Sequence, residues 1–322
     1  MLITYNELTL TLRAVDALLL PYYKGSTFRG GFGNVFRRVV CALKRQDCTD
    51  CILKQKCIYA YVFETSPEQD AEIMHTDKYS KVPHPFIIEP PDETRETFEP
   101  GEIILFKLIL VGKAAEYLPY FIYTFDELGK TGIGRGRGKY SLLSVHNESG
   151  TIYSSGDKII KNVTAGTINV NEEFEFACAG ESSIKLVLLT PTRISYRRVL
   201  TSELPFHILI RNLLRRIALL YYFHCEKRVP EYDPKRIIVE AENVAVIQSS
   251  IGWNDWERYS SRQGTKMKMG GMTGEITYKG NIGPFLGLLK AGEILHVGKG
   301  TSFGLGKYSI QDNAKTFRNL SD

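Results

Sequence analysis

The sequence predicts an α+β protein of two tandem domains, because one pair of motifs occurs twice in the same order. Residues 132–142 read GIGRGRGKYSL and residues 298–310 read GKGTSFGLGKYSI, so both contain Gly-x-Gly-Lys-Tyr-Ser. Upstream, Phe28 and Phe206 are each followed nine positions later by two arginines and an apolar run. The offsets of 178 and 168 between the copies indicate a duplication with roughly ten residues inserted in the first copy.

Hydrophobic periodicity gives both halves the same order of elements. The first half predicts strands at 5–13, 102–112 and 140–145 and helices at 28–45 and 117–128. The second half predicts strands at 183–190, 237–248, 274–278 and 307–310 and helices at 202–223 and 284–290. We interpret each half as strand, helix, two strands, helix, strand, the order of the ferredoxin-like fold, with only one strand identified between the two helices of the first half. We therefore expect two ferredoxin-like domains, residues 1–178 with a four-cysteine insertion and residues 179–322.

Length and charge limit the classes of function. A chain of 322 residues is long enough for two domains of about 150 residues each. The net charge of +5 does not by itself indicate nucleic acid, but residues 193–236 hold ten basic side chains against four acidic ones. This local surplus favours a polyanionic partner. Residues 64–102 hold eleven acids, three bases and six prolines, which predicts an irregular solvent-exposed excursion of the first domain.

The sequence contains no segment typical of export or membrane insertion. Arg13 and Asp16 interrupt the apolar N-terminal stretch, which lacks a basic leader and a cleavage site, so it predicts a core strand. No apolar run approaches the ~18 residues of a membrane span. Six cysteines in 322 residues are too few for a disulfide scaffold. We therefore expect a cytoplasmic protein that does not bind membranes.

Four of the cysteines lie in the insertion and predict a structural metal. Cys41, Cys48, Cys51 and Cys57 follow the spacing Cys-x6-Cys-x2-Cys-x5-Cys. Two thiolates on one tight turn can bind a tetrahedral Zn²⁺. We expect structural zinc rather than free thiols, and an iron-sulfur cluster is the alternative.

The two glycine-rich segments do not fit nucleotide-binding loops. A dinucleotide fingerprint follows a strand and opens a helix, whereas here a helix precedes and a strand follows. A Walker loop would need glycine where the second segment has Thr301. The shared cations instead predict contacts with a phosphate backbone, although a turn that merely needs positive φ also explains the glycines. These cations are Arg135, Arg137, Lys139, Lys299 and Lys307.

Further cations of the second half also predict nucleic-acid contacts. Residues 258–271 predict a hairpin arm with its cations on one face, beside aromatic side chains that can stack on bases. A flexible surface hairpin is the alternative. The cations of this arm are Arg258, Arg262, Lys266 and Lys268. On the preceding helix, His207, Arg211 and Arg215 are spaced four apart and share one stripe.

Five segments together resemble the CRISPR precursor-RNA-processing endoribonucleases of the repeat-associated mysterious protein (RAMP) superfamily. They are residues 26–41, 57–64, 82–91, 258–263 and 296–308, and the similarity extends over about residues 20 to 310. The resemblance implies two ferredoxin-like domains and cleavage of CRISPR repeat RNA without a catalytic metal. The 2′-hydroxyl would attack the phosphorus, leaving a cyclic phosphate and a 5′-hydroxyl.

The resemblance leaves alternatives and partners open. A non-catalytic RAMP-type RNA-binding subunit of a CRISPR effector complex is the main alternative. A zinc-stabilised nucleic-acid module outside the family would explain the cysteines and the charge, but not the repeated glycine loops. Partners implied are repeat RNA and CRISPR effector-complex proteins, and a homodimer stays open.

The catalytic residues are where this sequence departs from the family. Many members use a histidine near the first helix, but the first histidine here is His75. The resemblance then implies lysine and tyrosine in its place, and the competing imidazoles lie in the second half, one of them expected at a strand end. The candidates are Tyr22, Tyr23, Lys24, Lys44, His207 and His296. Arg29, Arg37 and Arg38 of the first helix are candidates for RNA binding.

Overall fold

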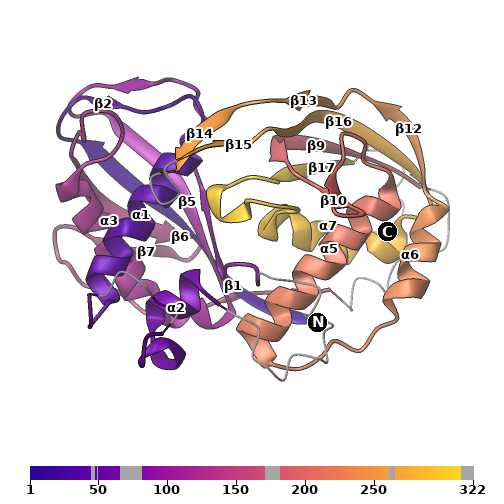
Figure 1. Ribbon diagram of the computed structural model, residues 1–322, viewed down its shortest axis with the longest axis horizontal. Coiled ribbons are helices and arrows are strands. Elements are labelled where there is room, and N and C mark those ends of the chain that lie inside the picture. Colours follow the sequence, from indigo (N-terminus) through magenta and orange to yellow (C-terminus); the bar gives the residue numbers. More distant parts are fainter. Residues whose placement is uncertain (45–47, 49, 66–81, 171–181, 261–264, 313–322) are drawn as a thin grey trace, which may run out of the picture. The chain divides into compact units, whose positions relative to one another are not determined.

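The computed structural model describes residues 1–44, 48, 50–65, 82–170, 182–260 and 265–312. The chain forms two compact units (Figure 1). The N-terminal unit comprises Thr4–Thr167 with Tyr222–Val229, and the C-terminal unit comprises Met1–Ile3, Ile168–Tyr221 and Pro230–Asp322. The predicted domain boundary at residues 178 and 179 lies outside the described residues. Within the described ranges, no helix is long and apolar enough to span a membrane.

The N-terminal unit has an antiparallel sheet in the order β3-β5-β1-β6-β7. Its strands are β1 (Leu2–Ala14), β3 (Phe86–Glu89), β5 (Ile103–Val111), β6 (Tyr140–Asn147) and β7 (Gly150–Ser154), with β8 (Gly166–Asn169) beside β1 and a separate pair β2 (Leu18–Leu19) and β4 (Thr97–Phe98). Its helices are α1 (Gly25–Val40), α2 (Ile58–Phe63) and α3 (Leu118–Thr131).

Aromatic side chains hold α1 and α3 against this sheet. The ring of Phe32 on α1 stacks on Phe121 and Phe125 of α3, with centroids 5.0 and 4.9 Å apart. Phe28 of α1 packs on Phe106 of β5 at 4.9 Å. Each of these rings is at most 2% exposed, so the apolar stripes predicted from the sequence form one core.

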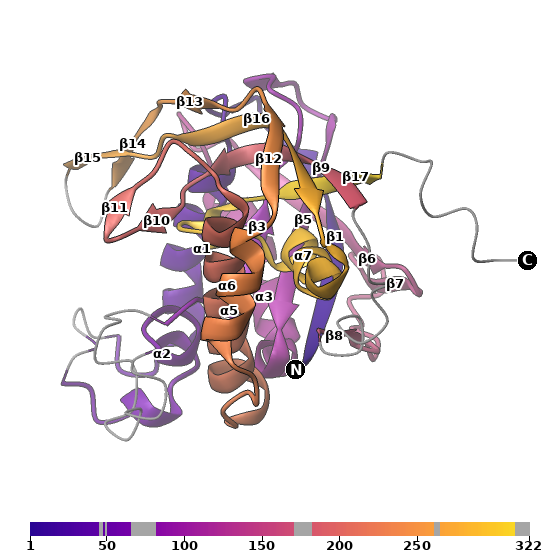
Figure 2. The ribbon, with the colours of Figure 1, turned by 90° about the vertical axis from the view of Figure 1, so that its right-hand side faces the viewer.

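The C-terminal unit repeats the arrangement with the sheet order β12-β16-β9-β17. Its strands are β9 (Ser182–Thr192), β12 (Ala245–Ser249), β16 (Gly271–Gly280) and β17 (Tyr308–Asp312), with β13 (Gly252–Asn254) on β16 and the pairs β10 (Ser195–Tyr196) with β11 (Val199–Leu200) and β14 (Glu257–Ser260) with β15 (Thr265–Lys268). Its helices are α5 (Phe206–Leu220), α6 (Pro234–Glu242) and α7 (Leu286–Leu295). Helices α5 and α7 lie on the same face of the sheet (Figure 2).

Both units thus place the first strand of the repeat between the third and the fourth. In sequence order, β3-β5-β1-β6 and β12-β16-β9-β17 each read second, third, first, fourth. This is the split βαβ arrangement of the ferredoxin-like fold. The fold class predicted from the duplicated motifs is confirmed.

Two element predictions were wrong. The acidic stretch 64–102 was expected to be irregular, but β3 within it is fully buried and pairs with β5. The strand expected at 237–248 is helix α6 followed by β12. The β-branched run there is typical of a strand, but the carboxylate of Asp233 accepts from the amides of Lys235 and Arg236, and Pro234 opens the first turn.

Candidate functional site

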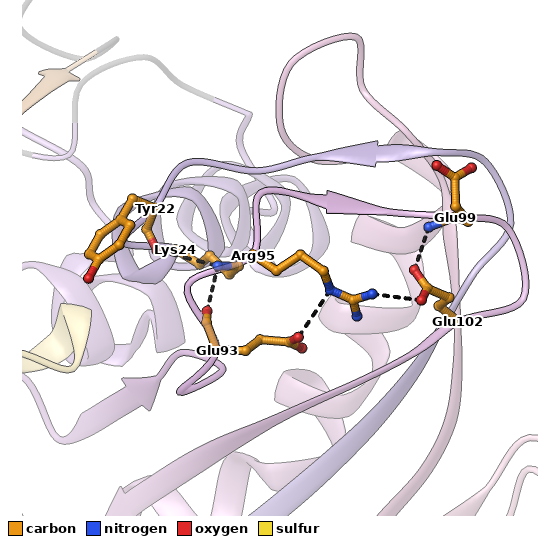
Figure 3. A network of polar contacts seen from close by, with 6 residues as sticks. All are labelled: Tyr22, Lys24, Glu93, Arg95, Glu99 and Glu102. Atoms are coloured by element: carbon orange, nitrogen blue, oxygen red, sulfur yellow. Dashed lines mark hydrogen bonds and ion pairs between the residues drawn. The ribbon is translucent and has the colours of Figure 1, made fainter.

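Lys24 lies immediately before α1, and only 1% of its surface is exposed. Its Nζ donates to the main-chain oxygen of Glu93 at 2.7 Å and to that of Tyr22 at 3.3 Å (Figure 3). The ammonium also lies 5.9 Å from the centre of the Phe98 ring. Burial lowers the pKa of Lys24, which favours the neutral amine. The residue therefore ties the start of α1 to the loop before β4.

An arginine network stiffens the same loop, and no pattern in the sequence predicted it. Arg95 binds Glu93 through Nε at 3.2 Å and Glu102 through Nη1 at 2.6 Å (Figure 3). Glu102 also accepts the amide of Glu99 at 2.6 Å, and the guanidinium lies 4.3 Å from the centre of the Phe98 ring. Each exposed ion pair contributes little to stability. Because Arg95 and Glu102 each take part in more than one of these contacts, together they hold the loop that binds Lys24.

The remaining first-domain catalytic candidates differ in their surroundings. Tyr22 is 64% exposed. Burial, and secondarily the carboxylate of Glu89, raises the pKa of Tyr23, so its phenol keeps its proton at neutral pH. Lys44 is exposed beyond the end of α1, which has 16 residues and therefore a length of about 24 Å. The structure places Tyr22, Tyr23 and Lys24 at one end of α1 and Lys44 past the other.

The two competing histidines lie in the C-terminal unit. His296 has no exposed surface, and its Nδ1–H donates to the main-chain oxygen of Leu305 at 3.0 Å. It follows the last residue of α7 and has a φ of 58°, so its expected place at a strand end was wrong. His207 lies in the first turn of α5 and is partly exposed, with its ring edge toward Tyr196 at 6.2 Å. Arg211 and Arg215 are exposed on the same helix.

The glycine loop of the C-terminal unit, residues 297–306, has a shape that only glycine allows. The amide of Val297 donates to Gly306 O at 2.9 Å, and Gly306 N donates to Pro191 O at 3.2 Å. Gly306 has a φ of 77°, and a Cβ there would lie 1.9 Å from Val297 O. The resulting turn leaves Lys299 exposed and Lys307 partly exposed.

The glycine loop of the N-terminal unit, residues 132–138, is built in a similar way. The amide of Ile133 donates to Gly138 O, and that of Arg135 donates to Leu19 O of β2, both at 2.9 Å. Arg135 and Arg137 are exposed on its outer turn. Each repeat therefore presents cations on a fixed backbone, as the duplicated motif predicts.

The three arginines of α1 are partly engaged by the protein itself. The guanidinium of Arg29 lies 4.9 Å from the centre of the Phe63 ring, and that of Arg37 lies 5.4 Å from Tyr59. Arg38 donates to Thr131 Oγ1 at 3.2 Å in an exposed contact. Planar guanidinium groups on aromatic faces can still offer their edges to phosphate oxygens.

The cationic hairpin is formed by β14 and β15 beyond β13 (Figure 1). Its register pairs Arg258 with Met267, and Glu257 with Lys268. Lys266 and Lys268 therefore occupy positions of one face and Arg258 a position of the other, so the expectation of one cationic face was wrong. Arg262 lies outside the described residues.

The cysteines of the insertion are partly exposed free thiols. In the described part of the chain, no three or more His, Cys, Asp or Glu side chains are grouped to hold a metal ion. Burial raises the pKa of the Cys48 thiol, whereas the nearby guanidinium of Arg37 acts to lower it. Nη2 of Arg37 donates to Cys48 Sγ at 3.7 Å. As described, the thiols do not form a ready tetrahedral site, so no part of the function is assigned to a metal. Zinc binding stays a prediction.

One buried histidine had no sequence signal. His224 has no exposed surface and comes from the segment of the second half that joins the N-terminal unit. Its Nε2–H donates to Pro83 O at 2.8 Å, and its Nδ1 accepts from the hydroxyl of Tyr61 at 3.2 Å. Both ring nitrogens are thus used in packing, which favours a structural role.

Comparison with known proteins adds to this geometry. Residues 3–165 match the family model AF_1859_N, an N-terminal domain, and residues 186–308 match that of the CRISPR-associated endoribonuclease Cas6. An uncharacterised protein of Archaeoglobus fulgidus is 28% identical over 301 residues, which cover 91% of this chain and 93% of that protein.

Solved structures share the fold at low sequence identity. Cas6 of Thermus thermophilus gives a TM-score of 0.53 at 17% identity, covering 96% of this chain and 99% of its own. A Cas6 product complex gives 0.53 at 16% identity, with 95% and 100% covered. A partial Cas6-RT-Cas1–Cas2 complex gives 0.56 at 14% identity, with 97% and 47% covered.

Two ferredoxin-like units, each with a helix leading into a glycine-rich loop, form a tandem fold that this chain shares with solved Cas6 structures. The N-terminal family match covers half of the chain, and the Cas6 match covers most of the remainder. The chain therefore belongs to the family defined by the AF_1859_N N-terminal domain, and its C-terminal unit matches the Cas6 endoribonuclease family, in agreement with the resemblance seen in its sequence motifs.

Proposed function

We propose that this chain is an endoribonuclease that cleaves CRISPR repeat RNA in precursor transcripts by 2′-hydroxyl attack, without a catalytic metal. The observation that carries the proposal is the match of residues 186–308 to the Cas6 endoribonuclease family, since this range includes the C-terminal glycine loop. Cas6 product complexes among the proteins of the same fold support it.

The proposed reaction is an internal transesterification. The 2′-oxygen attacks the adjacent phosphorus, the bond from phosphorus to the 5′-oxygen breaks, and the products are a cyclic phosphate and a 5′-hydroxyl. One group must accept the 2′-proton, and another must give a proton to the leaving oxygen. Cations stabilise the charge that develops on the phosphorane oxygens, and the bound backbone must hold attacking and leaving oxygens in line.

The segment before α1 is our proposed catalytic centre. Lys24 has a lowered pKa, and as a neutral amine it would accept the 2′-proton. Tyr23 keeps its proton and would donate to the leaving oxygen, while the exposed Tyr22 would contact the nucleotide. Because Lys24 donates to Glu93 O, the loop before β4 has to release the amine when RNA binds. Lys44, His207 and His296 stay alternative catalytic candidates.

The cations of both units provide the proposed RNA contacts. Those within the described residues lie on α1, on or next to the glycine loops, on α5 and on the β14–β15 hairpin, and cations of this kind bind phosphate oxygens. Alanine substitution of any one of these cations would reduce the slope of log affinity against log salt concentration by the amount expected for about one phosphate contact. The proposed contacts are Arg29, Arg37, Arg38, Arg135, Arg137, Arg211, Arg215, Arg258, Arg262, Lys266, Lys268, Lys299 and Lys307.

A specific observation favours a second candidate, a non-catalytic RAMP-type RNA-binding subunit of a CRISPR effector complex. The amine of Lys24 and the imidazole of His296 are both buried and hydrogen-bonded within the protein. A protein that only binds RNA would need neither group at the surface. In that case CRISPR effector proteins would be its partners, and the chain would retain repeat RNA uncut.

Single-turnover incubation of the full chain with its repeat RNA in EDTA separates the two candidates. The endoribonuclease predicts two fragments, with a cyclic phosphate on one and a 5′-hydroxyl on the other. Tight binding without fragments would support the RNA-binding subunit. Cutting that appears only after magnesium is added would contradict the proposed mechanism.

A further inference from the structure

Helix α7 ends with a carbonyl that its own helix does not satisfy. Leu295 is the last residue of α7, and its natural donor, the amide of Lys299, donates to Arg193 O at 2.9 Å instead. The Nε–H of Arg216, on α5, supplies the missing donor at 2.8 Å. His296 follows directly and leads into the glycine loop. A side chain of α5 therefore fixes the point where α7 passes into the loop.

Arg216 is an unusual residue for this position, because it is only 6% exposed. Its Nη2 has no hydrogen-bond partner among the residues that the structure describes. Burial alone lowers the pKa of Arg216 to about 9. A buried cation is costly, and an apolar side chain of similar size is often the more stable choice. The charge therefore needs an explanation other than packing.

The electrostatics of the helix end explain the buried charge of Arg216. The C-terminus of a helix carries a partial negative charge, so anions bind at helix N-termini and are repelled at C-termini. The glycine loop, which we propose to bind phosphate, follows the C-terminus of α7 directly. A guanidinium at Leu295 O neutralises that end of the helix before RNA arrives.

The N-terminal unit repeats the device. Arg38 occupies the position of α1 that corresponds to Arg216 at the repeat offset of 178. Its Nη2 donates at 3.2 Å to Oγ1 of Thr131, the last residue of α3, whose hydroxyl in turn donates to Glu127 O at 2.9 Å. Gly132 follows and begins the first glycine loop. Two copies of the duplication thus place an arginine at the same helix end.

We propose that Arg216 is a positioning residue for RNA binding, which holds the C-terminus of α7 at the start of the glycine loop and neutralises it so that the loop accepts a phosphate. Arg38 has the same role for the loop of the N-terminal unit. The inference rests on the proposed RNA-binding function, and it adds a role for both arginines that does not depend on their own contact with RNA.

The first test needs no RNA. Hydrogen exchange of the Val297, Lys299 and Gly306 amides is measured in the wild type, Arg216→Gln and Arg216→Lys, with Lys290→Gln as the control that removes an exposed charge from α7. We expect at least tenfold faster exchange in Arg216→Gln, restored in large part by lysine, and no change in the control. Unchanged exchange in Arg216→Gln would overturn the inference.

The more accessible Arg38 keeps this test decisive if Arg216→Gln does not fold. Arg38→Gln should speed exchange of the Ile133 and Arg135 amides without unfolding the N-terminal unit. Unchanged exchange of these amides in Arg38→Gln would overturn the inference that both arginines hold their glycine loops.

The second test is a double-mutant cycle on repeat-RNA affinity. Arg216→Gln should weaken binding about tenfold in the wild type, but less than threefold in Lys299→Ala, because both act through the same loop. Full additivity would show that Arg216 does not act through the loop and would overturn the inference. If wild-type protein binds no repeat RNA, the proposed function fails, while the exchange experiment still decides whether Arg216 holds the loop.

Discussion

Lys24 combines a structural contact with the proposed chemical role. Lysines are rarely buried, so the sequence offered it as a solvent-exposed or catalytic cation. The structure shows its ammonium beneath the loop before β4, bound to two main-chain oxygens. Burial lowers its pKa, which suits a base, whereas the carboxylates of Glu93 and Glu96 favour its protonated form. The variant Lys24→Met tests both the structural contact and the proposed catalytic role.

Lys24→Met should lower the free energy of unfolding by about 1–3 kcal/mol, because Glu93 O and Tyr22 O lose their donor. It should also slow single-turnover cleavage at least a hundredfold with less than a threefold change in affinity, as expected for a general base. Lys113→Met, an exposed change in the same unit, is the control. A loss of affinity that matches the loss of rate would mean that Lys24 only shapes the binding surface.

The pH dependence of stability should change in the same variant. The pKa of Lys24 in the folded protein lies below its usual 10.5, so between the two values the unfolded chain binds more protons. Wild-type stability therefore gains from a rise in pH within that window, and Lys24→Met should lose this contribution. The cleavage rate should rise with pH through the folded pKa in the wild type only. Denaturant titrations and rate profiles from pH 6 to about 10.5 provide the measurement, and superimposable curves would refute the assignment.

At the scale of elements, the glycine loops matter through their backbone rather than their side chains. Sequence spacing predicted the duplicated loops, but not which glycines are sterically required. A Cβ at Gly306 would clash with Val297 O, whereas a Cβ at Gly252, in β13, would meet no atom of the described residues within 4 Å. The two glycines therefore provide a matched pair.

Gly306→Ala should destabilise the C-terminal unit by roughly 1–3 kcal/mol and weaken RNA binding at least tenfold, because its left-handed φ and the Val297 carbonyl exclude a Cβ. Gly252→Ala should change stability by less than about 0.5 kcal/mol. Thermal denaturation and binding titrations measure both effects. Equal behaviour of the two variants would show that the loop backbone has no special role.

The hairpin register makes a separate prediction about salt dependence. Lys266→Ala with Lys268→Ala removes two cations from one face, and Arg258→Ala removes one from the other. For single-stranded RNA, each lost phosphate contact should reduce the log-log salt slope by about 0.7. Titrations at several salt concentrations show which face contacts RNA. If neither variant changes the slope, the hairpin does not bind the phosphate backbone.

At the scale of the whole molecule, the sequence predicted the duplicated motifs and the strands in which apolar residues alternate with polar ones. The motif offset and the periodicity of residues 5–13 and 102–112 indicated the tandem ferredoxin-like fold, because they report locally on buried faces. Strand β3 was missed because its four buried residues lie within an acidic, proline-rich stretch. Helix α6 was missed because β-branched residues outweighed the cap at Asp233.

The sequence predicted the residue types of the candidate site, but not which of its side chains are buried. Most cations of the glycine loops are exposed, as the motifs suggested, but the buried Lys24 contacts Glu93, 69 positions away in the sequence. Arg216 belongs to the repeated arginine pair, but its contact with Leu295 and that of His224 with Pro83 had no recognisable pattern, since these partners lie 79 and 141 positions away. Single-sequence reasoning cannot assign such contacts.

The proposed mechanism is tested most directly with a repeat RNA that has one 2′-deoxy nucleotide immediately before the scissile phosphate. In EDTA, we expect this RNA to bind as tightly as the unmodified repeat and to stay intact, while the unmodified repeat is cut to a cyclic phosphate and a 5′-hydroxyl. Removing the nucleophile leaves the phosphate contacts in place, so only the chemical step is lost. Cleavage of the deoxy substrate at the same position would contradict the proposed mechanism.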